Sequence, residues 1–296
     1  MLYEGDIYRP PSEARSVLIQ VTVGCSHNEC TFCNSYREKH FHIRTMEDIK
    51  ENMKLLREYY PLGSPQAKKL FLTDGDALCL STNKLLEIMS YADELFPDHE
   101  RVCAYGSAQD VLRKSVEELR TLKDAGLDII YLGCESGNDR VLEHVRKGVT
   151  RQQQIDAIHR LRQAGLRSSV TYITGLGGKA MWREHAVDSA TQINEANTDY
   201  VSFLTLQERP GAPLNDEIAR GEFELLTPAE VLDEMELVFE HLAPEGPCVF
   251  RSNHASNYLV LAGTLPQDTQ ALLEKIRYAK KNMEVLRPEF MRRYRQ

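Results

Sequence analysis

The feature that most constrains the fold is a regular alternation, from residue 16 onward, of short apolar runs with segments of helical periodicity. Such alternation is typical of successive βα units, which build a parallel sheet or barrel. We therefore expect an α/β protein with a partial (β/α)6 TIM-type barrel. The predicted strands are residues 16–24, 69–74, 101–105, 128–133, 167–173 and 199–205.

Helix boundaries are marked by side chains that can cap the first turn. A hydroxyl three residues before a carboxyl or amide side chain has the spacing of a capping box. Glycine just after the last apolar position favours the left-handed residue that ends a helix, and two segments end this way, at Gly126 and Gly165. The capping pairs are Thr45 with Asp48, Ser115 with Glu118, Thr150 with Gln153 and Thr227 with Glu230.

Length and composition are compatible with one large domain. The chain has 296 residues, 42% hydrophobic and 27% charged, which is globular composition. We expect an N-terminal segment (1–15), a core barrel (16–206) and a C-terminal extension (207–296) that closes the barrel and contributes to a substrate site. The first residues lack an apolar signal region, and no run is long enough for a membrane helix, which predicts a cytoplasmic protein without membrane partners.

The net charge of -8 argues against nucleic-acid binding, which usually needs a basic face to displace counterions from phosphates. A small-molecule substrate fits the charge better. There are seven cysteines, an odd number. In a reducing compartment this favours metal or redox roles over disulfides.

Three cysteines, Cys25, Cys30 and Cys33, lie in the run VTVGCSHNECTFCN directly after the first predicted strand. Three thiolates can hold a cubane iron–sulfur cluster that keeps one iron open for a second ligand. The alternative is a structural zinc site completed by His27 or a distant residue, since zinc prefers four closed ligands. The position of the loop, at the face where barrel active sites form, favours the cluster.

At this point the chain resembles the radical S-adenosylmethionine (radical SAM) superfamily, whose usual signature after the first strand is C-x3-C-x-φ-C, with an aromatic residue at φ. Phe32 occupies φ, and one extra residue separates the first two cysteines. The resemblance implies a [4Fe-4S] cluster on Cys25, Cys30 and Cys33. It also implies reductive cleavage of S-adenosylmethionine (SAM) to a 5'-deoxyadenosyl radical that abstracts hydrogen. An electron donor such as flavodoxin or ferredoxin is then required.

The resemblance extends over roughly residues 16–215. The family's Gly-Gly-Glu-like turn after the second strand binds the amino group of SAM, and it is matched loosely by Asp74, Gly75 and Asp76. The segment GCESGNDRVLEHVRKG is similar to one found in several radical SAM groups, including the oxygen-independent coproporphyrinogen oxidases. By that similarity Glu135 would meet the ribose and Lys147 the SAM carboxylate.

An adenine pocket is implied at the Gly-rich end of the fifth predicted strand, VTYITGLGG, with an aromatic cover from Phe32. Further polar residues are expected at the mouth of the predicted barrel, near this pocket, after the third predicted strand. The residues expected here are Thr171, Gly175, Leu176 and Gly177 for the adenine, and Tyr105, Ser107 and Gln109 for the mouth.

The substrate is the least determined part. The polar run CVFRSNHASNYL offers Arg251 to bind a carboxylate and His254 as donor or acid, or it is a polar loop that closes the barrel. Cys134 is a candidate hydrogen-atom donor, against the ordinary role of a small buried residue. We expect a small, anionic organic substrate. Two alternatives stay open: modification of a macromolecule such as tRNA or protein, and a non-enzymatic, zinc-stabilised α/β binding module.

Overall fold

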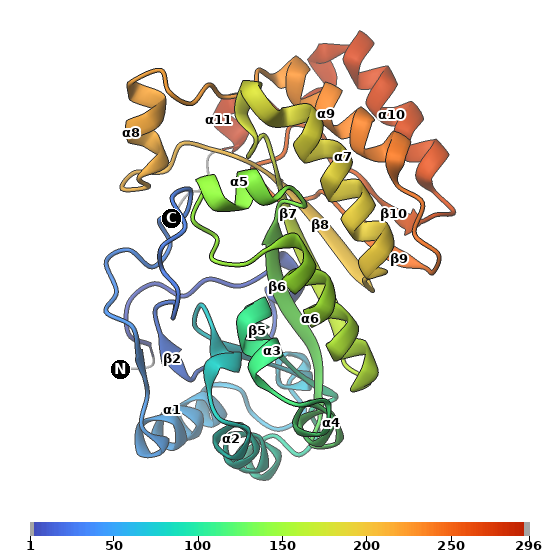
Figure 1. The fold of residues 1–296 in the computed structure, drawn as a ribbon. Helices are drawn as coiled ribbons and strands as arrows, with labels where there is room; N and C mark the ends of the chain where they lie inside the picture. Colours follow the sequence, from blue (N-terminus) through green and yellow to red (C-terminus); the bar gives the residue numbers. More distant parts are fainter. Residues whose placement is uncertain (1–2, 293–296) are drawn as a thin grey trace. The chain divides into compact units, whose positions relative to one another are not determined.

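The computed structural model describes residues 3–292, and its elements alternate between strands and helices along most of the chain (Figure 1). Eight strands form a sheet in the order β1-β4-β5-β6-β7-β8-β9-β10. Every pairing given by register is parallel except β9 with β10. The strands are β1 (Val17–Gln20), β4 (Lys69–Thr73), β5 (Arg101–Gly106), β6 (Leu127–Glu135), β7 (Arg167–Thr174), β8 (Tyr200–Thr205), β9 (Cys248–Arg251) and β10 (Ala262–Leu265).

The predicted α/β class and all six predicted strands are confirmed, with two corrections. The predicted strand 16–24 is interrupted, because Val21 bonds through its N–H to Thr73 and through its carbonyl to the N–H of Arg44. The chain then continues as β2 (Thr22–Val23), which pairs antiparallel with β3 (His42–Ile43). The second correction is that the region after residue 206 adds strands β9 and β10 to the sheet.

The helices begin and end largely where the capping residues predicted. Thr45, Ser115, Thr150 and Thr227 each accept a hydrogen bond from a backbone N–H in the first turn of the helix that follows. The helices are α1 (Met46–Tyr59), α2 (Thr82–Leu95), α3 (Ala108–Arg113), α4 (Val116–Asp124), α5 (Asp139–His144), α6 (Arg151–Gln163), α7 (Gly178–Ala196), α8 (Leu214–Ala219), α9 (Pro228–His241), α10 (Thr269–Lys281) and α11 (Glu289–Arg292). Among the described residues, none of them is both long and apolar enough to cross a membrane.

The chain divides into two compact units, and the first comprises residues 1–28, 35–132 and 157–168. It contains β1, β4, β5 and most of β6, covered by α1, α2 and α4 (Figure 1). Phe71 is fully buried and meets Tyr105 and Tyr131 edge to face, at centroid distances of 4.9 and 5.6 Å. This packing fixes the ends of the strands from which the candidate site loops emerge.

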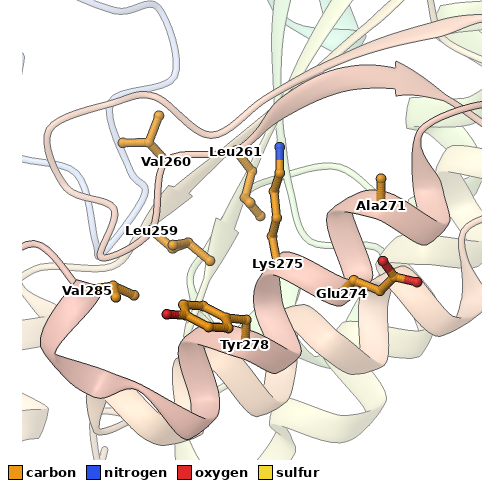
Figure 2. A pocket seen from close by; sticks show the side chains of 8 residues that line it. All are labelled: Leu259, Val260, Leu261, Ala271, Glu274, Lys275, Tyr278 and Val285. Carbon is orange, nitrogen blue, oxygen red and sulfur yellow. The ribbon is translucent and has the colours of Figure 1, made fainter.

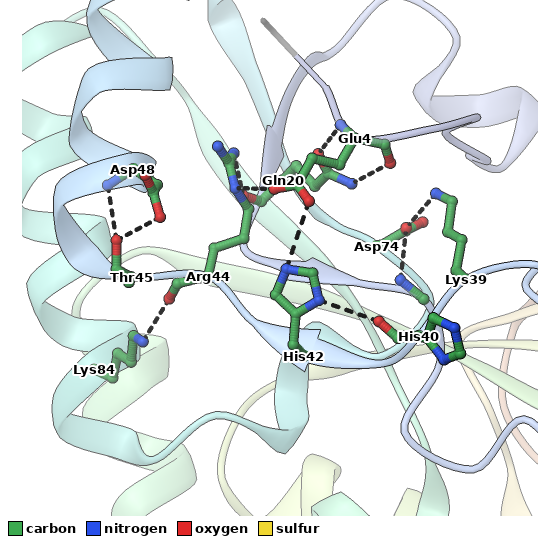
Figure 3. Close-up of polar contacts among 11 residues, drawn as sticks. Glu4, Gln20, Lys39, His40, His42, Arg44, Thr45, Asp48, Asp74 and Lys84 are labelled. Atoms are coloured by element: carbon green, nitrogen blue, oxygen red, sulfur yellow. Dashed lines mark hydrogen bonds and ion pairs between the residues drawn. The ribbon is translucent and has the colours of Figure 1, made fainter.

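The N-terminal segment is held along the first unit by polar contacts. The backbone N–H of Glu4 donates to the side chain of Gln20 at 2.8 Å, and its carboxylate lies near His42 and Arg44 (Figure 3). Further along the segment, the fully buried Glu13 accepts hydrogen bonds from Arg101 and Tyr131, both at 2.6 Å. The segment is therefore an integral part of this unit.

The second unit comprises residues 29–34, 133–156 and 169–296. Its strands β7, β8 and β9 are parallel, and β10 returns antiparallel at the edge. Helices α7, α9 and α10 pack side by side (Figure 1). The predicted boundaries at residues 15 and 206 remain predictions, and residues 1–2 and 293–296 lie outside the described part of the chain.

Candidate functional site

The cysteine run is divided between the two units, with Cys25 in the first and Cys30 and Cys33 in the second. All three thiols are half-buried, and none takes part in a disulfide within the described residues. In the second unit the backbone N–H of Cys33 donates to the carbonyl of Cys30 at 3.2 Å. Thr31 is bonded on both sides, to the carbonyl of Val145 and the N–H of Leu214. Within residues 3–292, no three His, Cys, Asp or Glu side chains are grouped as a metal site, so this ligand set stays a prediction.

In the first unit, the turn after β4 carries Asp74, Gly75 and Asp76. Asp74 is fully buried and forms an ion pair with Lys39 at 2.7 Å, and it also accepts the N–H of Gly24 (Figure 3). A Cβ at Gly75 would lie 2.6 Å from the Tyr36 ring and 3.0 Å from the Cβ of Cys25. Only glycine therefore fits here, and it brings the turn against the cysteine loop.

Asp76 differs from Asp74 because it forms no ion pair among the described residues, although the charge of Arg113 acts on it. It is 2% exposed, and the Ser26 hydroxyl donates to its Oδ2. As in Asp74, no described donor reaches its Oδ1. Burial, together with the neighbouring carboxyl of Asp110, raises the pKa of Asp76 well above its usual range. Asp110 itself is bonded to Arg113 at 3.0 Å. Asp76 of the turn and Asp110 of α3 thus form a buried carboxyl pair that a bound cation would stabilise.

The segment after β6 places Glu135 and Lys147 together in the second unit. Lys147 Nζ lies 3.1 Å from Glu135 Oε1, and Glu135 adopts a left-handed backbone with φ of 69°. Burial opposes the lysine charge, but Glu135 and Cys30 outweigh it and raise the pKa of Lys147. A Cβ at Gly133 would lie 2.0 Å from Glu135 Oε1, so the ion pair rests directly on the backbone of β6.

The Gly-rich turn after β7 contains Gly175 and Leu176, two of the residues predicted to bind the adenine. Leu176 is 1% exposed and belongs to an apolar cluster with Val141, Val145 and Ile173, and Phe32 packs against this cluster. Gly175 has a φ of 86°, a conformation that glycine tolerates best. Thr171 lies earlier on β7 and is half-buried. Leu176 and Phe32 thus belong to one apolar cluster in this unit, and the use of that surface by an adenine stays a prediction.

After β5, two of the predicted residues have structural partners. The Ser107 hydroxyl caps α3 by accepting the N–H of Asp110 at 3.2 Å, and it also donates to the carboxylate of Asp110. Tyr105 packs on Phe71. Ser107 is thus bonded to the carboxyl pair described above.

In the predicted substrate loop, His254 and Arg251 have different surroundings. The Nδ1 of His254 lies 2.8 Å from the hydroxyl of Ser256, which accepts the N–H of Thr205 at the end of β8. Burial, followed by the positive charges of Arg209 and Arg287, lowers the pKa of His254 to about 4. Its imidazole is therefore neutral at pH 7.

The guanidinium of Arg251 is exposed and donates to the carbonyls of Phe250 and Gly263 at the β9–β10 edge. Cys134 lies on β6, is 1% exposed and has a pKa raised to about 12, chiefly by burial. Catalytic roles for both residues remain untested predictions.

Three polar residues that the sequence analysis did not single out are fully or almost fully buried: Asp110, His185 and Glu234. His185 lies on the buried face of α7, where Ser189 and Gln192 follow it at helical spacing. A polar stripe on an otherwise small and apolar helix face was the available signal. Glu234 carried no such signal, because one carboxylate in an acidic helix is ordinary.

A groove in the C-terminal extension is lined by none of the predicted site residues. Figure 2 shows that Lys275 rises from α10 toward the segment at Leu261. The groove is apolar for most of its length and open to solvent. Its lining residues are Leu259, Val260, Leu261, Ala271, Glu274, Lys275, Tyr278 and Val285.

Comparison with known proteins identifies the region that carries most of these residues. Residues 19–190 match the family model of the radical SAM superfamily. The chain is 24% identical to an uncharacterized methyltransferase of Pyrococcus horikoshii over 67% of this chain and 40% of that protein. It is 26% identical to a tRNA-2-methylthio-N(6)-dimethylallyladenosine synthase of Marinomonas over 70% of this chain and 46% of that protein. The chain thus spans less than half the length of these curated relatives.

Among solved structures, coproporphyrinogen III oxidase from Escherichia coli, which its description calls a radical SAM enzyme, superimposes with a TM-score of 0.54. The sequence identity is 16%, and the match covers 77% of this chain and 54% of that one. At this identity the likeness shows the fold alone. It confirms the predicted resemblance to the partial barrels of this group.

Proposed function

This chain belongs to the radical SAM superfamily of enzymes, which use a [4Fe-4S] cluster and SAM, and on that premise we propose that Cys25, Cys30 and Cys33 bind the cluster. The proposed reaction is hydrogen abstraction from a small organic anion. The observation that carries the proposal is the C-x4-C-x2-C run within the matched region 19–190. Its position supports a cluster over a structural zinc ion.

The buried polar groups of the first unit fit SAM. The Oδ1 of Asp76 is buried without a described donor, and the neighbouring carboxyl of Asp110 adds like charge. An ammonium group would supply both the missing donor and the missing positive charge. Asp74 is already neutralised by Lys39, so Asp76 is the better of the two candidates for the SAM amino group.

Taken by itself, the second unit also contains residues that the family resemblance assigns to SAM. Lys147 is a half-buried cation for the SAM carboxylate, and Glu135 is an acceptor for the ribose hydroxyls. Leu176 and Phe32 supply apolar cover for the adenine. When bound, the cluster and SAM supply an electron and a carbon-centred radical. The task of these residues is to hold SAM in one orientation and to exclude water.

Support for an anionic substrate comes from the charge around His254. Arg209 and Arg287 both lie close enough to lower its pKa, so the loop at the end of β8 has a positive potential. Arg287 also bonds through one guanidinium nitrogen to the carbonyls of His254, Ala255 and Asn257, at 2.8 to 3.2 Å. It thereby orders the loop, which leaves Arg209 as the residue proposed to contact the anion.

A second candidate is modification of tRNA, because several curated relatives are named tRNA-2-methylthio-N(6)-dimethylallyladenosine synthases. The net charge of -8 weighs against it. Filter binding of tRNA at low and physiological salt separates the two proposals. Retention of tRNA with a steep salt dependence would favour this candidate over a small anion.

The central test is anaerobic reconstitution with iron and sulfide, followed by reductant and SAM. The proposal expects about four irons per chain, visible absorption and formation of 5'-deoxyadenosine. Cys30→Ala and Cys33→Ala are expected to lose all three. Cys248→Ala is the matched control, because Cys248 lies in β9 outside the cysteine run. Stoichiometric zinc without SAM cleavage would contradict the proposal.

A further inference from the structure

A buried polar cluster in the second unit joins the turns after β6 and β7. The Nδ1 of His185 lies 2.7 Å from the Ser136 hydroxyl, which also accepts the N–H of Asn138 at 3.0 Å. The carbonyl of Ile173 can only accept, so Nε2 carries the hydrogen of the neutral ring, and Nδ1 accepts from the Ser136 hydroxyl. Nε2 lies 3.1 Å from the carbonyl of Ile173 on β7, to which it donates.

Glu234 of α9 completes this cluster from the other side. Both of its carboxyl oxygens accept the backbone N–H of Gly175, at 2.9 and 3.1 Å. Its Oε1 also lies 3.5 Å from His185 Nε2. Glu234 and Ser136 have no exposed surface, and His185 has 1%. We define these three residues as the Ser136–His185–Glu234 cluster.

Helix α7 fixes the turn after β6 by additional contacts. The Ser189 hydroxyl accepts the N–H of Gly137 at 2.9 Å, and the carboxylate of Asp188 accepts from the Asn138 side chain at 2.6 Å. A Cβ at Gly137 would lie 2.2 Å from the carbonyl oxygen of Asp188. The turn therefore rests directly on α7, and the cluster links it to the turn at Gly175.

We propose that Glu234 is a positioning residue, which holds the Gly175 turn in the shape that receives the adenosyl group of SAM, while His185 and Ser136 tie that turn to the one at Glu135. This inference rests on the proposed function for the identity of the ligand. Glu234 lies outside the matched region 19–190. The C-terminal extension thus contributes a contact that the core alone lacks.

The test compares Glu234→Leu, which removes the acceptor, with Glu234→Gln, which keeps an acceptor oxygen of similar shape. Glu240→Gln on the exposed side of the same helix is the matched control, since its partner is the surface residue Arg277. Two readouts are used on the full chain. The first is equilibrium dialysis of labelled SAM with reconstituted protein, and the second is hydrogen exchange of peptides covering residues 171–178 without SAM.

We expect Glu234→Leu to weaken SAM binding by more than about tenfold, the equivalent of one lost buried hydrogen bond. Its iron content should be unchanged, and the 171–178 amides should exchange faster. Glu234→Gln should restore both readouts to near wild type. If Glu234 had a purely structural role, Glu234→Leu would lower thermal stability without changing SAM affinity or the exchange of the 171–178 amides. Unchanged SAM affinity and unchanged exchange in a folded Glu234→Leu protein would therefore overturn the inference.

Two further arms keep the test decisive. If Glu234→Leu does not fold, Ser136→Ala replaces it, because this small change removes the hydroxyl that bonds to His185 and to the N–H of Asn138. Unchanged SAM affinity and unchanged exchange would again overturn the inference. If the wild-type protein binds no SAM, the proposed function fails. The exchange readout then still shows whether Glu234 holds the Gly175 turn.

Discussion

Two buried polar clusters at the ends of strands differ in how completely their groups are bonded. In the first unit, Asp76 and Asp110 place two carboxyls together, and Asp76 Oδ1 has no described donor. In the second unit, every polar atom that we describe in the Ser136–His185–Glu234 cluster has a bonding partner. The first cluster leaves a buried acceptor open, whereas the groups of the second are bonded within the protein.

The difference separates binding groups from scaffold. A buried polar atom that lacks a partner costs free energy, so it persists where a ligand supplies the partner or where function requires strain. A saturated network instead fixes the geometry of the loops around it. This difference is why we propose that Asp76 contacts SAM and that Glu234 supports the binding turn.

The largest expected effect comes from creating an unpaired carboxylate in the second unit. Lys147→Met should leave Glu135 buried without its cation and lower the free energy of unfolding by about 3 kcal/mol. Urea denaturation at pH 7 measures it. Lys179→Met, at a surface lysine with longer ion pairs of 3.6 and 3.8 Å, is the control and should change stability little. Equal effects of the two variants would contradict the assignment of Lys147 to a buried pair.

The next effect tests the incomplete cluster. Asp76→Asn should weaken SAM binding about 50-fold, or about 2.3 kcal/mol, because a neutral amide cannot form an ion pair with the ammonium group of SAM. Stability should not fall, since the change removes one of two like charges in a buried site. Equilibrium dialysis and denaturation measure the two quantities, with the exposed Asp124→Asn as control. If Asp76→Asn destabilised the protein but left SAM affinity normal, Asp76 would be a structural residue and not a binding group.

The pH dependence of stability tests the saturated cluster. Burial raises the pKa of Glu234 from 4.5 to about 8, so this group makes stability fall as pH rises between these values. Burial lowers the pKa of His185 from 6.5 to about 4, so that group makes stability rise with pH up to 6.5. Above pH 6.5 only the fall from Glu234 remains, worth about 2 kcal/mol up to pH 8.

The unfolding free energy of Glu234→Gln, measured in urea, should therefore depend less on pH between 6.5 and 8 than that of the wild-type protein. Glu240→Gln should keep the wild-type slope. If the two variants behave alike, the carboxyl of Glu234 does not titrate as its burial requires.

The smallest expected effect concerns an exposed helix cap whose hydrogen bonds are complete. Ser115→Ala removes the capping box of α4, in which Ser115 and Glu118 bond reciprocally to backbone N–H groups. A loss of about 1 kcal/mol is expected. Thermal unfolding measures it against Ser90→Ala, at an exposed position of α2, which should be neutral or slightly stabilising. If Ser115→Ala did not change thermal stability, the hydrogen bonds of this cap would make no net contribution to the free energy of unfolding.

Local patterns predicted the strands and most helix boundaries because the contacts involved are close in sequence. The Thr45 cap spans three residues, and so does the Ser115 capping box. The interruption at Val21 was missed because it depends on contacts with Thr73 and Arg44, more than twenty residues away. Strand β9 was missed because it begins a polar run that resembles a loop, and β10 because its four residues, Ala262–Leu265, form no clear apolar pattern.

For the site, the sequence by itself determined the cysteine spacing, the Gly-rich turns and the family, since these are encoded within short segments. Only the tertiary structure decided which charges are neutralised. It paired Asp74 with Lys39, left Asp76 beside Asp110, and brought Glu234 to a backbone N–H 59 residues earlier in the chain. The physical reason is that a side chain's charge and bonding depend on what the fold packs around it, and those neighbours come from distant segments whose approach no local pattern specifies.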